Sequence, residues 1–124
     1  MSNSFTDIIA WKESHKFVLL VYNITSTFPE EEKFGLYSQF RRAAISIPAN
    51  IAEGYRKIGK ADKLRFLNIS QGSLEECRYY IILSKDLGYI DEQTFQQLFN
   101  ALERTSWFLN SYAKGIIDNN AMKK

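Results

Sequence analysis

Five polar residues spaced three or four apart are the first candidates for chemistry in this sequence. They are Gln39, Arg42, Ser46, Asn50 and Glu53. On an α-helix they share a strip about 60° wide, beside an apolar strip. Their side chains suit a hydrogen-bonded network between packed helices, whereas a solvated face would more often carry Lys and Glu. Ser73 and Glu76 would face them across an antiparallel helical pair, with Arg42 in reach of Glu76. The pattern fits a ligand site or a structural polar network, and we favour the network.

Few other residues of the sequence suit catalysis or metal binding. A di-iron or di-manganese bundle needs two Glu-x-x-His pairs, and a zinc site ordinarily needs four ligands. The chain has one histidine, His15, and one cysteine, Cys77, and lacks GxGxxG and P-loop patterns. We expect Cys77 to be a small buried hydrophobe. We therefore predict that the protein is not an enzyme and has no cofactor or metal, although composition leaves a Ser-His-Asp triad open.

Basic residues are concentrated between positions 41 and 65. This segment holds seven basic and two acidic residues, in a chain of net charge +2. Such a concentration indicates either a solvated basic surface, the more common case, or a surface that binds RNA or DNA phosphates. The residues predicted to bind nucleic acid are Arg41, Arg56, Lys57, Lys60 and Lys63.

Length and composition indicate one globular domain spanning residues 1–124. Of its residues, 45% are hydrophobic and 24% charged, and it has only 6 Gly and 2 Pro, which favours long helices over tight turns. A single cysteine suits a reducing cytoplasm. There is no signal-peptide pattern, and the longest apolar run, residues 17–22, is too short to cross a bilayer. We expect a cytoplasmic protein without membrane contact.

The apolar spacing predicts helices at residues 7–27, 31–55, 61–87 and 92–117, with residues 1–6 and 118–124 frayed. Pro29 should end the first helix, Pro48 should kink the second, with a break as the alternative, and Asp91 should cap the fourth. Short joins make the helices antiparallel neighbours, so we predict an all-α, up-down-up-down four-helix bundle. The first helix has two apolar faces, which suggests packing against another subunit, and mid-helix Gly72 suggests close approach of another backbone.

Four segments of the sequence resemble a known family. They read AWKESHKFVLLVY, FPEEEKFGLYSQFRRAAISIPANIAEGYRK, FLNISQGSLEEC and LGYID. They are similar to S23-type four-helix bundle proteins, which are encoded in intervening sequences of bacterial 23S rRNA genes. Relatives include the accessory variability protein of diversity-generating retroelements. The matching motif positions are Gln39, Arg42, Ser46, Ile47, Pro48, Asn50, Ile51, Glu53, Gly54, Gly72, Ser73 and Glu76.

The resemblance implies a four-helix bundle that assembles into a homopentamer, and no catalytic role for these positions. For the retroelement relatives it also implies a nucleic-acid-binding basic surface and a reverse-transcriptase partner. Two hypotheses result. In the first, an oligomer presents its basic residues to RNA or DNA phosphates without base specificity. In the second, a protein-interaction scaffold without nucleic-acid contact docks a partner through Tyr37, Tyr55 or Trp107.

Overall fold

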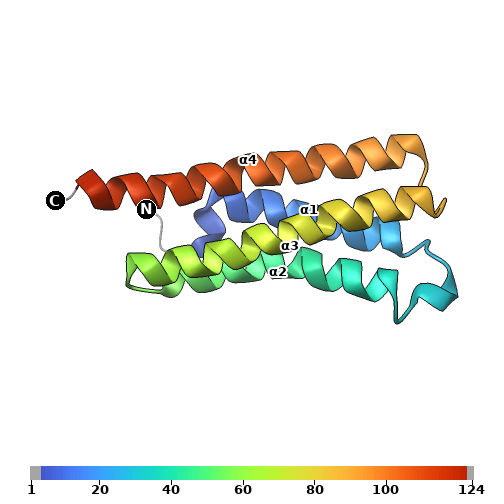
Figure 1. Cartoon of the computed structure of the whole chain (residues 1–124), viewed down its shortest axis with the longest axis horizontal. Helices are drawn as coiled ribbons and strands as arrows, with labels where there is room; N and C mark the ends of the chain where they lie inside the picture. Colours follow the sequence, from blue (N-terminus) through green and yellow to red (C-terminus); the bar gives the residue numbers. More distant parts are fainter. Residues whose placement is uncertain (1–3, 123–124) are drawn as a thin grey trace.

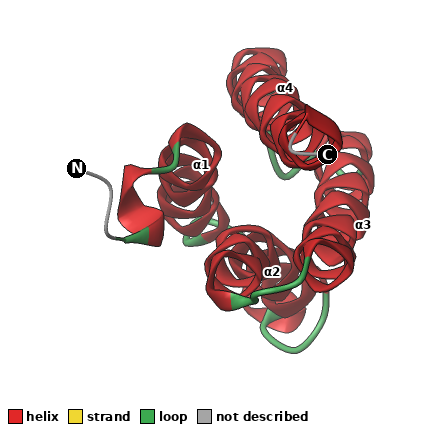
Figure 2. Cartoon of the chain, turned by 90° about the vertical axis from the view of Figure 1, so that its left-hand side faces the viewer, coloured by secondary structure: helices red, strands yellow, loops and turns green. Residues whose placement is uncertain are grey.

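Four long helices make up the fold in the computed structural model, which describes residues 4–122. They are α1 (Ile9–Thr25), α2 (Leu36–Arg56), α3 (Lys60–Asp86) and α4 (Glu92–Met122), and short 3-10 turns lie at Phe5–Asp7 and Glu30–Glu32. Each helix runs antiparallel to the next, and α1 also packs against α4. Viewed from one end, the helices follow each other around the bundle (Figure 2). The predicted all-α, up-down-up-down four-helix bundle is confirmed.

The helix bounds differ from the sequence prediction mainly at two places. The second helix begins at Leu36 rather than near residue 31, because Glu30–Glu32 form a separate turn. The carboxylate of Glu32 accepts hydrogen bonds from the Leu36 N–H at 2.9 Å and the Tyr89 hydroxyl at 2.7 Å. The hydrogen bonds from Tyr89 and from Leu36 lower the pKa of Glu32, and the one from Leu36 caps the start of α2. Helix α4 runs on to Met122, through residues expected to fray, whereas residues 1–3 and 123–124 lie outside the described part.

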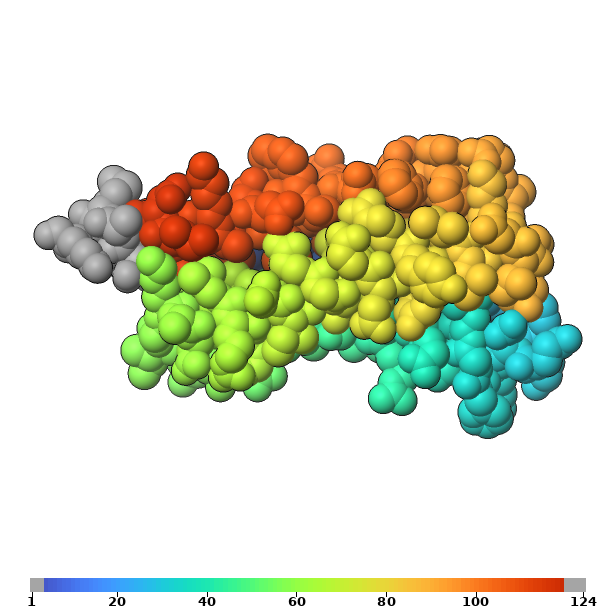
Figure 3. Space-filling view, viewed as in Figure 1, coloured from blue at the N-terminus to red at the C-terminus, as the bar shows by residue number. Residues whose placement is uncertain are grey.

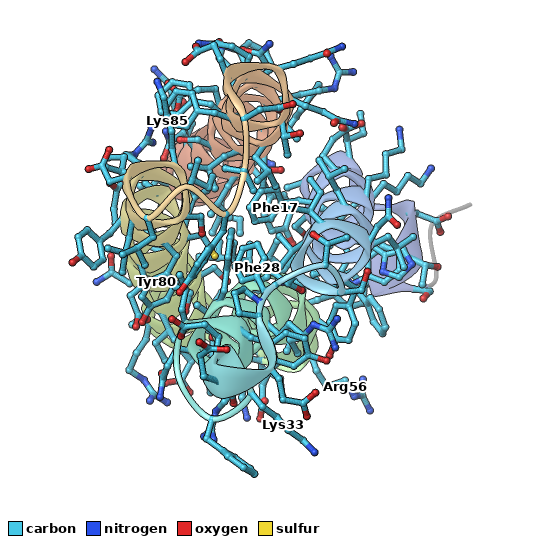
Figure 4. All side chains as sticks on the ribbon, turned by 90° about the vertical axis from the view of Figure 1, so that its right-hand side faces the viewer. Phe17, Phe28, Lys33, Arg56, Tyr80 and Lys85 are labelled. Carbon is cyan, nitrogen blue, oxygen red and sulfur yellow. The ribbon has the colours of Figure 1, made fainter. Side chains whose placement is uncertain are left out.

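The core is a continuous apolar layer between the four helices. Its largest fully buried apolar side chains are Phe17, Val21, Phe40, Ile47, Ile51, Leu67, Leu74, Ile81, Leu98, Leu102 and Leu109. Phe17 of α1 and Phe28, in the connection that follows α1, lie between the helices in Figure 4. Cys77 is fully buried among them, and burial raises the pKa of its thiol. The prediction that Cys77 is a small core hydrophobe is therefore confirmed.

Helix α2 continues through Pro48 as one element, so the alternative of a break into two helices is wrong. Buried side chains keep their helical spacing on both sides of the proline, from Phe40 through Ile47 to Ile51. The Ser70 hydroxyl of α3 donates to the Ile47 carbonyl at 2.9 Å, one residue before the proline. Packing against α3 thus supports α2 where proline removes a backbone donor.

The turn between α3 and α4 is capped on both sides, and the cap at Asp91 is the one that the sequence predicts. Gly88 has φ +78°, a conformation that favours glycine, and the N–H of Tyr89 reaches the carbonyl of Ser84 at 2.9 Å. Asp91 accepts a 2.8 Å hydrogen bond from the Thr94 N–H, which lowers the pKa of Asp91. No helix in residues 4–122 combines the length and apolarity needed to cross a membrane.

Helices α2 and α3 approach most closely beside Gly54. A Cβ at this position would lie 3.1 Å from the Phe66 Cβ and 3.3 Å from the Lys63 carbonyl oxygen, and both atoms are fixed to α3. A Cβ at Gly72 or Gly115 would meet nothing within 4 Å. Within the described residues, no other part of the chain makes the close approach expected at Gly72, and such an approach is found at Gly54.

We expect Gly54→Ala to lower the free energy of unfolding by about 1–3 kcal/mol, because the added methyl forces α2 and α3 apart. Gly115→Ala is the matched control, in open space within α4, and should raise stability by up to about 1 kcal/mol through helix propensity. Urea unfolding followed by circular dichroism measures both changes. Equal changes in the two variants would contradict a packing role for Gly54.

Candidate functional site

The structure joins three of the predicted network residues across α2 and α3. The Ser73 hydroxyl donates to the Ser46 hydroxyl oxygen at 2.7 Å. The Asn50 amide donates to the same oxygen at 3.0 Å and to the Ser46 carbonyl at 2.8 Å. Ser73 is buried and the other two are half-buried. This cluster, together with the Ser70 hydrogen bond, fixes the register of the two helices.

The other four residues of the expected network, Gln39, Arg42, Glu53 and Glu76, are exposed. Glu76 accepts a 3.4 Å hydrogen bond from the Tyr80 hydroxyl. Within residues 4–119, whose side chains are described, the expected Arg42–Glu76 ion pair is not formed. Both side chains lie on the outer faces of their helices rather than in the seam that holds Ser46 and Ser73. The polar strip therefore divides into a structural half and a solvent-facing half.

The one histidine of the sequence, His15, packs against an aromatic residue of its own helix. His15 is exposed on α1, where its ring stacks on Trp11 at 5.1 Å between centroids. Among the described residues no three His, Cys, Asp or Glu side chains are grouped as metal ligands would be.

Arg41, one of the predicted nucleic-acid-binding residues, is used inside the fold. Its Nε donates to the Thr25 hydroxyl at 2.8 Å and its Nη2 to the Tyr22 carbonyl at 3.0 Å. Its guanidinium lies 4.1 Å from the Tyr22 ring centroid and 4.0 Å from that of Tyr37. Arg41 thus caps the last turn of α1 from α2 and is held between two aromatic rings.

Lys63 has a similar structural role at the end of α2. Its Nζ donates to the carbonyl of Tyr55 at 2.8 Å and lies 3.5 Å from that of Gly54. The Lys60 Nζ reaches the Ile117 carbonyl of α4 at 3.5 Å, which is a weak contact. Of these two lysines, only Lys60 keeps most of its hydrogen-bonding capacity for a partner.

Arg56 and Lys57 could contact a bound nucleic acid, and the structure adds Arg65 as a third candidate. Lys57 Nζ and the Arg65 guanidinium lie 5.1 Å and 4.8 Å from the Phe66 ring centroid. Arg65 also pairs with Asp62 at 3.3 Å, but both side chains are mostly exposed, so the pair is weak. Sequence reasoning left Arg65 out of the site. Arg65 follows Lys57 by eight residues, on the other side of the turn that contains Gly59, and it stands next to Phe66. This pattern is the signal that could have identified it.

These cations flank the turn between α2 and α3, and we call the group the basic end. It comprises Arg56, Lys57, Lys60 and Arg65. They surround the α2–α3 turn, at the green end of the molecule in Figures 1 and 3. The opposite end of the bundle carries the α1–α2 and α3–α4 turns, with Glu30–Glu32, Asp86, Asp91 and Glu92. Cations are therefore in excess at the basic end, where Asp62 pairs with Arg65, and carboxylates are in excess at the opposite end, which also carries Lys33 and Lys85.

The three aromatic residues considered for partner docking are placed differently. Tyr37 packs against Arg41 and Tyr55 lies beneath Lys63, and both are half-buried. Trp107 on α4 is 64% exposed. Exposed apolar side chains also occur on the outer faces of α2 and α3, namely Ile45, Ile69, Tyr79 and Ile82.

Both the sequence and the fold of this chain are similar to those of known proteins. The family model described as 23S rRNA-intervening sequence protein matches residues 6–111. A crystal structure from Bacteroides thetaiotaomicron, of a protein with unknown function from the S23 ribosomal protein family, matches with a TM-score of 0.79 and 25% sequence identity. The match covers 86% of this chain and 99% of that chain. A search of curated proteins gave no match.

We expect Arg41→Ala to lower the free energy of unfolding by about 1.5–3 kcal/mol, because charged hydrogen bonds and two ring contacts are lost. Arg41→Lys should recover only part of this, since an ammonium cannot make the same fork of bonds. Arg56→Ala is the control and should change stability by no more than about 0.5 kcal/mol. Urea unfolding measures all three. Indistinguishable values for Arg41→Ala and Arg56→Ala would show that the capping role is absent.

Proposed function

The chain belongs to the 23S rRNA-intervening sequence protein family, and we propose that it is a non-catalytic oligomer that binds nucleic-acid phosphates through its basic end. The observation that carries the proposal is the grouping of Arg56, Lys57, Lys60 and Arg65 around one turn, away from the carboxylates of the opposite end. Buried Cys77 suits a reducing compartment, and we place the protein in the cytoplasm.

The chemistry of the basic end supports contact with phosphates rather than recognition of base sequence. Arg56 and Arg65 are exposed and Lys57 and Lys60 half-buried. Cationic side chains at a surface attract a polyanion by releasing its counterions, and this attraction is independent of base sequence. A single chain offers few such contacts, so its affinity is weak. Repetition of the same end in an oligomer multiplies the contacts, because a closed cyclic assembly presents each feature at the same distance from its axis.

The proposed subunit contact is the outer face of α2 and α3. Gly72 lies there with open space around it, and Ile45, Ile69 and Tyr79 are exposed nearby. A glycine that no part of its own chain approaches lets a neighbouring helix come close. Arg42 and Glu76 on the same face could then pair between chains rather than within one. The resemblance to S23-type proteins supports a homopentamer.

A protein-interaction scaffold is the second candidate function, and the exposure of Trp107 favours it. This side chain is 64% exposed and packs edge-on against Phe108, with ring centroids 5.0 Å apart. Aromatic residues with this exposure are common in protein interfaces. Recovery of one defined protein by pulldown after nuclease treatment, lost in Trp107→Ala, would favour this function.

We expect the double variant Arg56→Gln/Lys57→Gln to weaken RNA binding and to reduce the slope of log K against log salt by about 1 to 2 per chain. The matched control is Lys33→Gln/Lys85→Gln, which removes two charges at the opposite end, where Figure 4 labels both lysines. Fluorescence anisotropy at several salt concentrations measures both. Equal losses in the two variants would mean that net charge, and not the basic end, determines binding.

For the oligomer, we expect a native mass of five chains of 14.4 kDa each. Gly72→Gln should shift the protein to smaller species while keeping its helicity, since a side chain there meets nothing in its own chain. Gly115→Gln is the matched control and should keep the assembly. Native mass spectrometry, with and without nuclease, reports the mass. A wild-type monomer, or equal dissociation of both variants, would refute this interface.

A further inference from the structure

We propose that Ile58 is an apolar wedge that contacts unstacked bases, so that the basic end prefers single-stranded nucleic acid to a duplex. The inference rests on the proposed function, which it deepens by naming the form of nucleic acid. Ile58 lies in the turn at residues 57–59, between α2 and α3.

Ile58 is 98% exposed, more than any other large apolar side chain in the described part of the chain. It does not pack against the core, so folding gains nothing from its apolar surface. Gly59 follows it, with open space around the position of a Cβ. Because the next residue is a glycine, no side chain adjoins Ile58 on its C-terminal side. The Ile58 side chain is therefore accessible from several sides.

The surroundings of Ile58 define the chemistry of its partner. Arg56 and Lys57 precede it, Lys60 follows it, and Arg65 lies beside Phe66 on the adjoining helix. The Lys57 ammonium is held near the Phe66 ring, at 5.1 Å from its centroid, while Ile58 points away from the helices into solvent. A partner that fits must offer negative charge around a central apolar surface.

Nucleic acid with accessible bases has this combination. Phosphates engage the cations, and the face of an unstacked base offers an apolar surface to the isoleucine. In an intact duplex the base faces are stacked on each other, so insertion of an apolar side chain must first unstack a step. An anionic membrane is a poorer fit, because one isoleucine buries little apolar area compared with the broad apolar face of interfacial segments.

The test compares a fluorescein-labelled 20-nucleotide RNA without self-complementarity and its perfect duplex, by anisotropy with Ile58→Ser. We expect the Kd for the single strand to rise about five- to tenfold, within the range of losing one base contact, and the Kd for the duplex to change less than twofold. Phe34→Ser is the matched control, because Phe34 is 89% exposed at the opposite end of the bundle. This variant should change neither Kd. Circular dichroism checks that each variant keeps its helicity.

Equal effects of Ile58→Ser on both RNAs, or no effect on either, overturn the wedge. The proposed function survives that result if the wild type binds RNA and Arg56→Gln/Lys57→Gln does not. A wild type that binds neither RNA refutes both proposals. Sedimentation with phosphatidylserine vesicles tests whether an anionic membrane, rather than RNA, is the partner of the basic end. Vesicle binding that Ile58→Ser abolishes, with RNA binding unchanged, would assign the tip to a membrane and overturn the inference.

Discussion

The close approach of α2 and α3 at Gly54 is the constraint on which the surface of this protein depends. With no side chain at that position, the Phe66 Cβ and the Lys63 carbonyl come within contact distance of α2. Ser46, Ser73 and Ser70 then form hydrogen bonds across the seam. The short turn that follows Gly54 carries its cations at the end of the bundle. Packing of two helices thereby determines where charge appears.

The helices and most of their ends could be predicted because each depends on local signals. Apolar residues at helical spacing define one buried face, and Gly88 and Asp91 act within a few residues of their own positions. The start of α2 was missed for the opposite reason. The Glu32 carboxylate accepts hydrogen bonds from the Leu36 N–H and from the hydroxyl of Tyr89, 57 residues away in sequence. The three glutamates resemble the first turn of a helix, but they form a 3-10 turn separate from α2.

The candidate site was less predictable, because a basic residue looks the same in sequence whether it meets solvent or its own backbone. The sequence pattern groups Arg41 and Lys63 with Arg56 and Lys57. In the structure, Arg41 and Lys63 donate hydrogen bonds to backbone carbonyls at the C-terminal ends of α1 and α2. Which of them does so depends on the tertiary position of each helix terminus. In the same way, Ser46 and Arg42 lie on the same strip of α2 in the sequence pattern. Only the tertiary structure shows that Ser46 contacts α3 whereas Arg42 faces solvent.

Segregation of the charges has a consequence for motion as well as for contact. A bundle with an excess of cations at one end and an excess of carboxylates at the other carries a dipole along its long axis. In the field of a polyanion such a molecule experiences a torque, so it rotates toward a productive orientation before the surfaces touch. If the chain binds a polyanion as proposed, this arrangement raises the rate of encounter, because electrostatic steering increases association rates.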